Sequence, residues 1–133
     1  MEKGIRLVGS RITKISANRN PEFKGKLNMS TNIKILDAEK IKESKDTIKV
    51  TYEYTIDYEE LGQITLGGIL FISSDQKTLK DMLKQHKDKN YETPEQLALT
   101  NLIIQKASIK AIDLEDELSL PIHVKLPALN FKK

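Results

Sequence analysis

The segment TIKVTYEYTIDY, Thr47–Tyr58, alternates strictly along its whole length. Every even position is apolar or aromatic, and every odd position is Thr, Lys, Glu or Asp. Side chains leave a β-strand on opposite faces in turn, so this pattern predicts a strand with one buried face and one wet face. The β-branched and aromatic residues that fill it are the ones a pleated surface favours.

A second strand follows after a polar turn at Glu59–Gly62. In Gln63–Ile72 the apolar positions are even before Gly67 and odd after Gly68. One inserted residue at Gly67-Gly68 would restore the register, and glycine inside a strand often marks such a β-bulge. Thr47–Ile72 is therefore predicted to be an antiparallel hairpin with a bulge in its second strand.

Two further strands are predicted upstream of this hairpin. Ile5–Arg19 is extended, with a slip of the apolar phase at Val8-Gly9-Ser10 that predicts a bulge. A loop over Asn18–Gly25 follows, and the next strand has its apolar face at Leu27, Met29, Thr31, Ile33 and Ile35. The charged segment Asp37–Asp46 is predicted to be an exposed connection. Sequential strands joined this way favour an antiparallel meander.

Helical periodicity replaces alternation after Ser73. Ser74 is a possible N-cap, and a narrow apolar stripe then follows at Leu79, Met82, Leu83 and His86. This helix is expected to end near Lys89-Asn90. Thr93, Pro94 and Gln96 then have the spacing of a helix N-terminus, which predicts a second helix running to about Glu117. The predicted fold class is α+β: a four-stranded antiparallel sheet, two helices and an extended C-terminal tail.

The second helix has more apolar surface than one sheet can cover. It carries one stripe at Leu97, Ile104, Ala107, Ala111, Leu114 and Leu118. It carries another at Ala98, Leu102, Ile109 and Ile112. A helix that is apolar on nearly all sides must be covered on more than one side, by a second subunit, by the chain's own tail or by a bound polypeptide.

The tail, Leu118–Leu129, is expected to be extended, since Pro121 and Pro127 disfavour a helix. Its even positions from 118 to 126 are all apolar. Two interpretations stay open: the tail covers its own helix, or it lines a groove.

Size and charge restrict the class of protein. With 133 residues and no cysteine, the chain is predicted to be one domain without a disulfide framework or a thiol nucleophile. It shows no signal peptide and no apolar run of the roughly 20 residues that a membrane helix needs, so we expect a cytoplasmic protein without membrane contact. Its 22 basic and 19 acidic residues are interspersed and almost all the bases are lysines, which disfavours nucleic acid as a partner.

The sequence predicts neither a catalytic constellation nor a metal or cofactor site, and we expect a protein that is not an enzyme. His86 lies on the apolar stripe of the first helix, where packing or an interface is the better interpretation. His123 is predicted to be solvated, and the carboxylates of Glu59-Glu60 and Glu115-Asp116-Glu117 likewise. Tyr52, Tyr54 and Tyr58 share the apolar face of their strand, so they are expected in the core or an interface rather than stacked on nucleic acid.

The order of elements resembles the SecB family of export chaperones, together with its archaeal and toxin–antitoxin-associated relatives. The resemblance runs from about Ile12 to Phe131. Its best local match is Gly67–Ile72, GGILFI, which is similar to a Gly-Gly-Ile-Phe segment that ends the family's fourth strand. Export members are strongly acidic and dock the SecA motor through that surface. This chain is slightly basic, which argues against SecA docking.

The resemblance implies an ATP-independent holdase that binds unfolded or nascent polypeptides and assembles as a dimer of dimers. First strands and first helices would form the two interfaces, through Ile12, Ile15, Leu79, Met82, Leu83 and His86. A client groove would be bordered by the sheet, by the end of the second helix and by the loop at Pro21-Glu22-Phe23, which is placed like the family's crossover loop. Its predicted residues are Phe23, Leu27, Met29, Leu114, Leu118, Leu120, Ile122, Val124 and Leu126. The alternatives are a structural or adaptor oligomer without chaperone activity and, less favoured, a nucleic-acid-binding protein.

Overall fold

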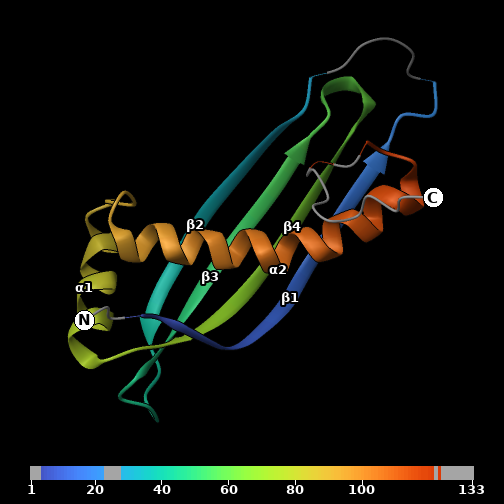
Figure 1. Ribbon diagram of the computed structural model, residues 1–133. Helices are drawn as coiled ribbons and strands as arrows, with labels where there is room; N and C mark the ends of the chain where they lie inside the picture. Colours follow the sequence, from blue (N-terminus) through green and yellow to red (C-terminus); the bar gives the residue numbers. More distant parts are fainter. Residues whose placement is uncertain (1–3, 23–27, 122, 124–133) are drawn as a thin grey trace, which may run out of the picture.

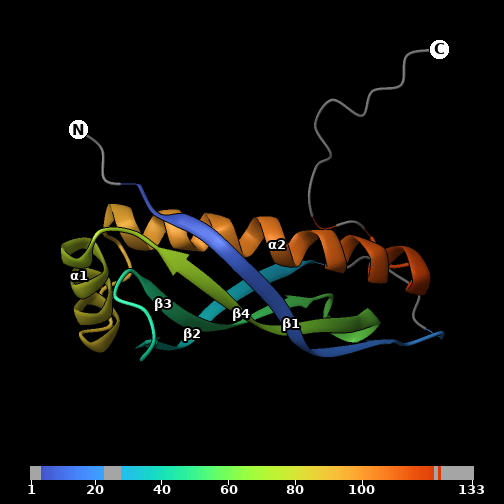
Figure 2. The same ribbon diagram turned by 90° about the horizontal axis from the view of Figure 1, so that it is seen from below.

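The computed structural model describes residues 4–22, 28–121 and 123. It confirms the α+β class: a four-stranded antiparallel sheet is followed by two helices, and both helices lie on the same face of the sheet (Figure 1; Figure 2). The longer helix crosses this face obliquely, and the shorter one stands at the end where the longer begins. The elements are β1 (Arg6–Arg19), β2 (Ser30–Lys40), β3 (Thr47–Asp57), β4 (Gly62–Ser73), α1 (Gln76–Lys87) and α2 (Pro94–Leu118).

The predicted hairpin forms the centre of the sheet. The strand order is β1-β4-β3-β2, so β3 and β4 each have a neighbour on both sides. This corrects the simple meander: β2, β3 and β4 follow one another, but β1 crosses over and pairs antiparallel with β4. The result is a Greek-key order, which leaves β1 and β2 as the two edges.

The alternation of β3 is confirmed, but the predicted bulge at Gly67-Gly68 is wrong. All even residues of Ile48–Tyr58 are buried under the helices. The β3–β4 register is continuous through Tyr52↔Gly68 and Glu53↔Gly67, so the even positions of β4 stay on the core face throughout. Ile69 and Phe71 therefore lie on the opposite face, where the Arg11 guanidinium lies 5.8 Å from the centroid of the Phe71 ring.

Gly68 occupies an even, core-facing position of β4, where it leaves space for the ring of Tyr52. A Cβ built at this position would lie 2.5 Å from the Tyr52 hydroxyl oxygen and 2.6 Å from the Arg11 carbonyl oxygen. The neighbouring tyrosine therefore fills the core volume that a side chain at position 68 would otherwise take. The absence of an apolar side chain at this even position therefore reflects packing against Tyr52 and not a shift of register.

The bulges lie in the edge strands. The β1–β4 register shifts between Leu7 and Gly9, which confirms the predicted irregularity at Val8, and shifts again between Ile12 and Lys14. β2 runs to Lys40, well past the predicted start of the exposed connection at Asp37, with its own irregularity between Ile35 and Asp37. Bulges strengthen the twist of edge strands and make them poorer templates for unwanted pairing.

Side-chain oxygens fix the start of each helix. The predicted cap of α2 is confirmed, because the Thr93 side chain accepts a hydrogen bond from the Gln96 amide. For α1 the cap is Asp75 and not Ser74: its carboxylate accepts from the Thr78 amide at 2.7 Å. The Ser74 hydroxyl instead donates to the Gly4 carbonyl.

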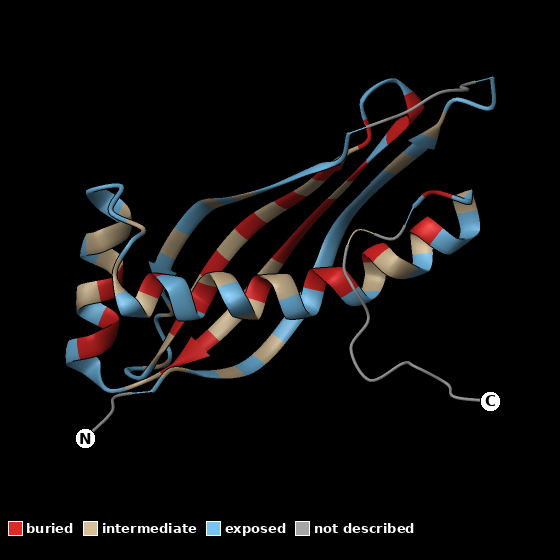
Figure 3. Ribbon diagram, turned by 45° about the horizontal axis from the view of Figure 1, so that its top comes forward, coloured by how far each residue is buried: buried red, intermediate tan, exposed pale blue. Residues whose placement is uncertain are grey.

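The buried face of α2 differs from both predicted stripes. From Leu99 onward its core residues follow four-residue steps, and four of the six were in neither stripe: Gln96, Leu99, Ile103 and Glu115, beside Ala107 and Ala111 (Figure 3). Leu97, placed in the first stripe, is instead 54% exposed. Because Gln96 and Glu115, at the two ends of this buried stripe, are polar, apolar spacing alone does not identify the stripe.

Among the described residues, no helix is both long enough and apolar enough to span a membrane.

Substitution of Gly68 tests the packing of Tyr52 against the central strand. Gly68→Ala should lower the free energy of unfolding by about 1–3 kcal/mol, because the new methyl group must displace the buried Tyr52 ring or the β1 backbone. The measurement is urea denaturation followed by circular dichroism. Gly4→Ala is the control, since a Cβ there meets nothing within 4 Å and should change stability by less than about 0.5 kcal/mol. Equal midpoints for the two variants would contradict the packing argument.

Candidate functional site

An open cleft lies beside the C-terminal half of α2. It has a volume of ≈ 750 Å³, within the range of ligand-binding clefts. Its lining combines apolar and acidic side chains with the turn that follows the helix: Ile109, Ile112, Asp113, Glu115, Asp116, Ser119, Leu120 and Pro121.

The turn that ends α2 shapes one wall of this cleft. Ser119 has a left-handed backbone with φ 55°, and the Leu120 amide donates to the Glu115 carbonyl at 2.8 Å. This is the hydrogen bond of a Schellman-type helix end, which folds the chain back and places the residue after the turn on the core. Leu120 is accordingly buried. The Arg19 guanidinium donates to the Ser119 carbonyl at 2.7 Å, so the end of β1 is fixed to the end of the helix.

A buried polar network lies behind the cleft. The Glu115 carboxylate accepts hydrogen bonds from the Tyr58 hydroxyl and from the backbone amide of His123, and it contacts the His123 ring nitrogen Nδ1 at 2.8 Å. The other ring nitrogen, Nε2, lies 3.1 Å from the Ser108 hydroxyl, and the Tyr58 hydroxyl lies 3.0 Å from the Pro121 carbonyl. The Glu115 and His123 side chains are 0% and 1% exposed. The prediction that both are solvated is therefore wrong.

The network keeps its phenol protonated. Burial raises the pKa of Tyr58 far above its ordinary value, and the hydrogen bond to the Glu115 carboxylate raises it further. The pKa of Tyr54 is also raised, mainly by burial. Tyr58 can therefore act as a lasting donor to the buried carboxylate, which satisfies a charge that would otherwise be costly to bury.

Ser108, His123 and Glu115 stand in the order of a hydrolytic triad, but their surroundings favour a structural role. Acyl transfer needs an accessible serine and donors aimed at the developing oxyanion. Ser108 is buried in the middle of α2, where the backbone amides donate to carbonyls four residues earlier. In the part of the chain that the structure describes, no three metal-ligating side chains come together either.

The apolar side of the cleft is open to solvent. Ile109 is 70% exposed, the largest value among the exposed large apolar residues of the described chain, and Ile112 lies one turn further along the helix. Acidic side chains border these isoleucines. Asp113 pairs with Lys110 at 3.3 Å, whereas Asp116 is exposed. The cleft can therefore offer apolar contact and negative charge to the same partner.

The predicted client-binding residues are only partly assembled here. Leu114 and Leu118 are half-buried against the core near the cleft, and Leu120 lines it from a buried position. Met29 is 37% exposed just before β2. Five predicted residues lie outside the described part of the chain: Phe23, Leu27, Ile122, Val124 and Leu126.

The predicted interface residues divide into two groups. Ile12 and Ile15 are exposed on the edge strand β1, as an interface requires. Leu79 and Met82 are buried in the core of this same chain, which contradicts their assignment to an oligomer interface. The remaining two are half-buried: Leu83 lines a different cleft, and His86 Nδ1 lies 2.9 Å from the Tyr91 hydroxyl.

Sequence reasoning missed the Tyr58–Glu115–His123 network because its members are far apart along the chain. One indication was available: Glu115 continues the four-residue steps of Ile103, Ala107 and Ala111, so a carboxylate occurs where the core face demands a buried residue. A charge at such a position requires a buried partner.

No family model matches the sequence, and no curated protein does. The fold is similar to that of the SecB-like chaperone Rv1957 of Mycobacterium tuberculosis, solved in complex with a ChAD peptide from the Rv1956 HigA1 antitoxin. That likeness has a TM-score of 0.53 at 12% identity over 92% of this chain and 86% of the other. A protein of unknown function from Streptococcus agalactiae is similar too, with a TM-score of 0.52 at 8% identity over 95% of this chain and 98% of that one. The fold is therefore SecB-like.

Removal of the Tyr58 hydroxyl tests the buried network. Tyr58→Phe should lower the free energy of unfolding by about 1–3 kcal/mol at neutral pH, since it takes a donor from the buried Glu115 carboxylate. The raised pKa adds a pH dependence. Above pH about 10 the unfolded chain loses the phenolic proton while the folded chain keeps it, so the wild type should lose stability as pH rises.

In the Tyr58→Phe variant the free energy of unfolding should decrease less steeply at alkaline pH than in the wild type, because the phenol of Tyr58, one of the groups that causes the decrease, is absent. Urea denaturation at neutral pH and at several alkaline pH values measures both effects. Parallel stability curves for the two proteins would show that Tyr58 does not couple to folding in this way.

Proposed function

We propose that this chain is an ATP-independent holdase that binds non-native polypeptide segments in the cleft beside the C-terminal half of α2. The observation that carries the proposal is Ile109, which is 70% exposed on a helix whose opposite face is in the core. Exposed apolar side chains grouped at a cleft are typical of surfaces that bind other chains. The SecB-like fold, shared with a chaperone that is solved with a bound peptide, supports the same function.

The lining of the cleft indicates which segments it would favour. Ile109 and Ile112 would contact apolar side chains, while Asp113 and Asp116 would attract lysine or arginine. Segments with mixed apolar and basic residues should therefore bind more tightly than apolar segments with acidic neighbours. Extended backbone in such a site exchanges readily, which suits the temporary holding of many different chains.

Substitution at Ile109 separates binding from folding. Ile109→Lys should reduce the suppression of thermal aggregation of an unrelated unfolded substrate, because it places a charge at the apolar centre of the cleft. The free energy of unfolding should change by less than about 0.5 kcal/mol, since the side chain is already exposed. Light scattering of the aggregating substrate measures the first effect and urea denaturation the second.

Gln105→Lys is the matched control, because it adds the same charge one turn earlier at an exposed position of α2 that does not line the cleft. It should suppress aggregation as the wild type does. If the wild-type protein leaves aggregation unchanged at equimolar ratio, the holdase proposal fails and a structural or adaptor role is favoured.

The edge strand β1 is the surface we propose for self-association. Its outer side carries no neighbouring strand within the described chain, and Val8, Ile12 and Ile15 are exposed along it. The bulges of β1 weaken continuous strand pairing, so the contact with a second copy would depend on these exposed apolar side chains.

Charge placed on this edge should prevent the association. The wild type should sediment or scatter light as a dimer or larger at micromolar concentration, and Ile15→Asp should shift it toward a single chain of 15.1 kDa. Thr31→Asp, which puts the same charge on the opposite edge strand β2, should leave the assembly intact. A wild-type protein that is monomeric under these conditions would rule out the interface.

A further inference from the structure

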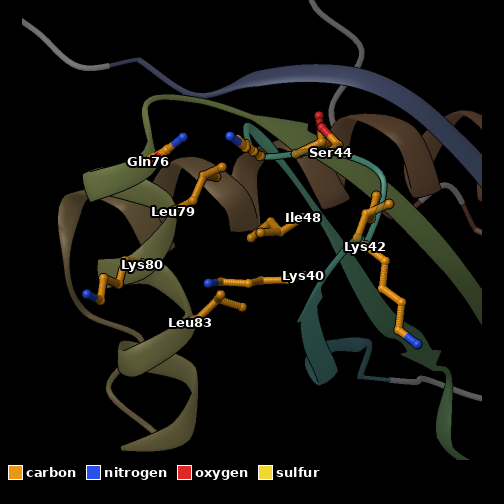
Figure 4. A pocket seen from close by; sticks show the side chains of 11 residues that line it. Lys40, Lys42, Ser44, Ile48, Gln76, Leu79, Lys80 and Leu83 are labelled. Atoms are coloured by element: carbon orange, nitrogen blue, oxygen red, sulfur yellow. The ribbon is translucent and has the colours of Figure 1, made fainter.

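A second cleft lies at the opposite end of the molecule, between α1 and the loop that joins β2 to β3 (Figure 4). Its volume is ≈ 520 Å³. The floor is apolar and consists of Ile41, Ile48, Leu79 and Leu83. α2, which has 25 residues and is roughly 37 Å long, begins near α1 and carries the first cleft along its C-terminal half.

Four lysines are among the lining residues: Lys40, Lys42, Lys45 and Lys80. Lys42 and Lys80 extend outward from the cleft into the surrounding solvent (Figure 4). None of the residues that line the cleft is acidic. The pairing of Lys40 with Ile48 between β2 and β3 places the lysine on the face of the sheet that α1 covers. Figure 4 shows its side chain extending from the strand toward α1, near Leu83. The lysine is therefore held at the mouth of the cleft by the register of the sheet.

The four ammonium groups have no carboxylate partner in the part of the chain that the structure describes. Of the neighbouring carboxylates, Glu39 pairs with Lys49 and Asp81 pairs with Lys77, whereas Glu43, in the loop itself, is exposed and does not line the cleft. Asp46, in the loop itself, accepts hydrogen bonds from the Ser44 and Thr47 hydroxyls. The lining of the cleft therefore carries four positive charges and no negative one, so the cleft is net positive.

We propose that this cleft, the lysine cleft, docks an acidic amphipathic segment of another protein. Its occupant would place apolar side chains against Leu83 and Ile41 and carboxylates beside the lysines, because only that combination satisfies both the floor and the rim. α1 presents Gln76, Leu79, Lys80 and Leu83 along one side of the cleft, which gives a surface roughly 10 Å long. That length suits a short peptide segment.

Other occupants fit the cleft less well. A symmetric contact with a second copy would bring the same lysines against one another, and like charges at an interface repel. Single-stranded nucleic acid binds on aromatic stacking platforms, and none of the residues that line this cleft is aromatic. Charge complementarity therefore points to an acidic polypeptide. The proposal does not depend on holdase activity, since the lysine cleft and the α2 cleft share no residue.

Fluorescence anisotropy with a designed peptide tests the proposal. The probe is a short fluorescein-labelled peptide in which glutamates flank leucine and phenylalanine, compared with the same peptide carrying glutamine at each glutamate. The wild-type protein should bind the acidic peptide more tightly, and added salt should weaken that binding. Reversal of two rim charges in the double variant Lys40→Glu/Lys80→Glu should weaken it by about tenfold or more.

Two control variants identify the site. Lys87→Glu/Lys106→Glu changes net charge equally at exposed positions that do not line the lysine cleft, and it should bind the acidic peptide within about twofold of the wild type. Ile109→Lys should likewise leave this binding intact while it impairs aggregation suppression. Circular dichroism melting confirms that each variant is folded.

Three results would overturn the proposal. One is equal affinity of the rim-reversed and wild-type proteins for the acidic peptide. Another is loss of its binding in Ile109→Lys, which would place the peptide in the α2 cleft. The third is tighter binding of single-stranded DNA or of anionic phospholipid vesicles, with the same dependence on Lys40 and Lys80. A protein that suppresses aggregation but fails these tests would keep the holdase function and lose only the second docking site.

Discussion

The Glu115 carboxylate is the constraint on which the arrangement of this protein depends. A carboxylate with 0% of its side chain exposed must have donors around it, because an unpaired buried charge costs several kcal/mol. Its partners come from two other parts of the chain: Tyr58, in the turn after β3, and His123, which supplies both its backbone amide and its ring nitrogen. To satisfy one charge, the end of α2, the turn after β3 and the segment beyond the helix must meet at one point. This junction fixes how α2 lies across the sheet and forms the wall of the cleft beside Ile109.

The two helices lie on one face of the sheet, and they leave part of the apolar surface of the sheet and of the helices exposed to solvent. The central strands β3 and β4 are buried on the helical side, whereas β1 at the edge leaves Ile12 and Ile15 open (Figure 3). α2 contributes its inner side to the core and presents Ile109 and Leu97 to solvent. A chain of this size has little material for a layer beyond the sheet and the two helices, so part of its apolar surface is available to other chains. Both the proposed holdase activity and the proposed self-association follow from this surplus.

Charge is distributed unequally between the two clefts, although the chain as a whole is nearly balanced. Asp113 and Asp116 border the cleft at the C-terminal half of α2, while lysines surround the cleft at α1. Each cleft pairs an apolar floor with a rim of one sign, so the two would select different partners. A net charge of +3 gives no indication of this separation, since it sums over surfaces that lie at opposite ends of the molecule.

The sequence by itself determined the central hairpin, the start of α2, the existence and approximate extent of both helices and the α+β class, because these depend on local periodicity and capping. Strict alternation in Thr47–Tyr58 places its even residues in the core wherever the strand lies in the sheet. Only the tertiary structure decided the pairing of β1 with β4, since both edges of the hairpin offer equivalent hydrogen-bonding groups. It also decided the surroundings of three residues that the pattern did not explain. Gly68 leaves space for the Tyr52 ring of the neighbouring strand. Glu115 and His123 are buried because residues far along the chain supply their hydrogen-bond partners. A local pattern predicts the secondary structure, whereas long-range packing determines which polar groups are hydrogen-bonded and which apolar side chains stay exposed.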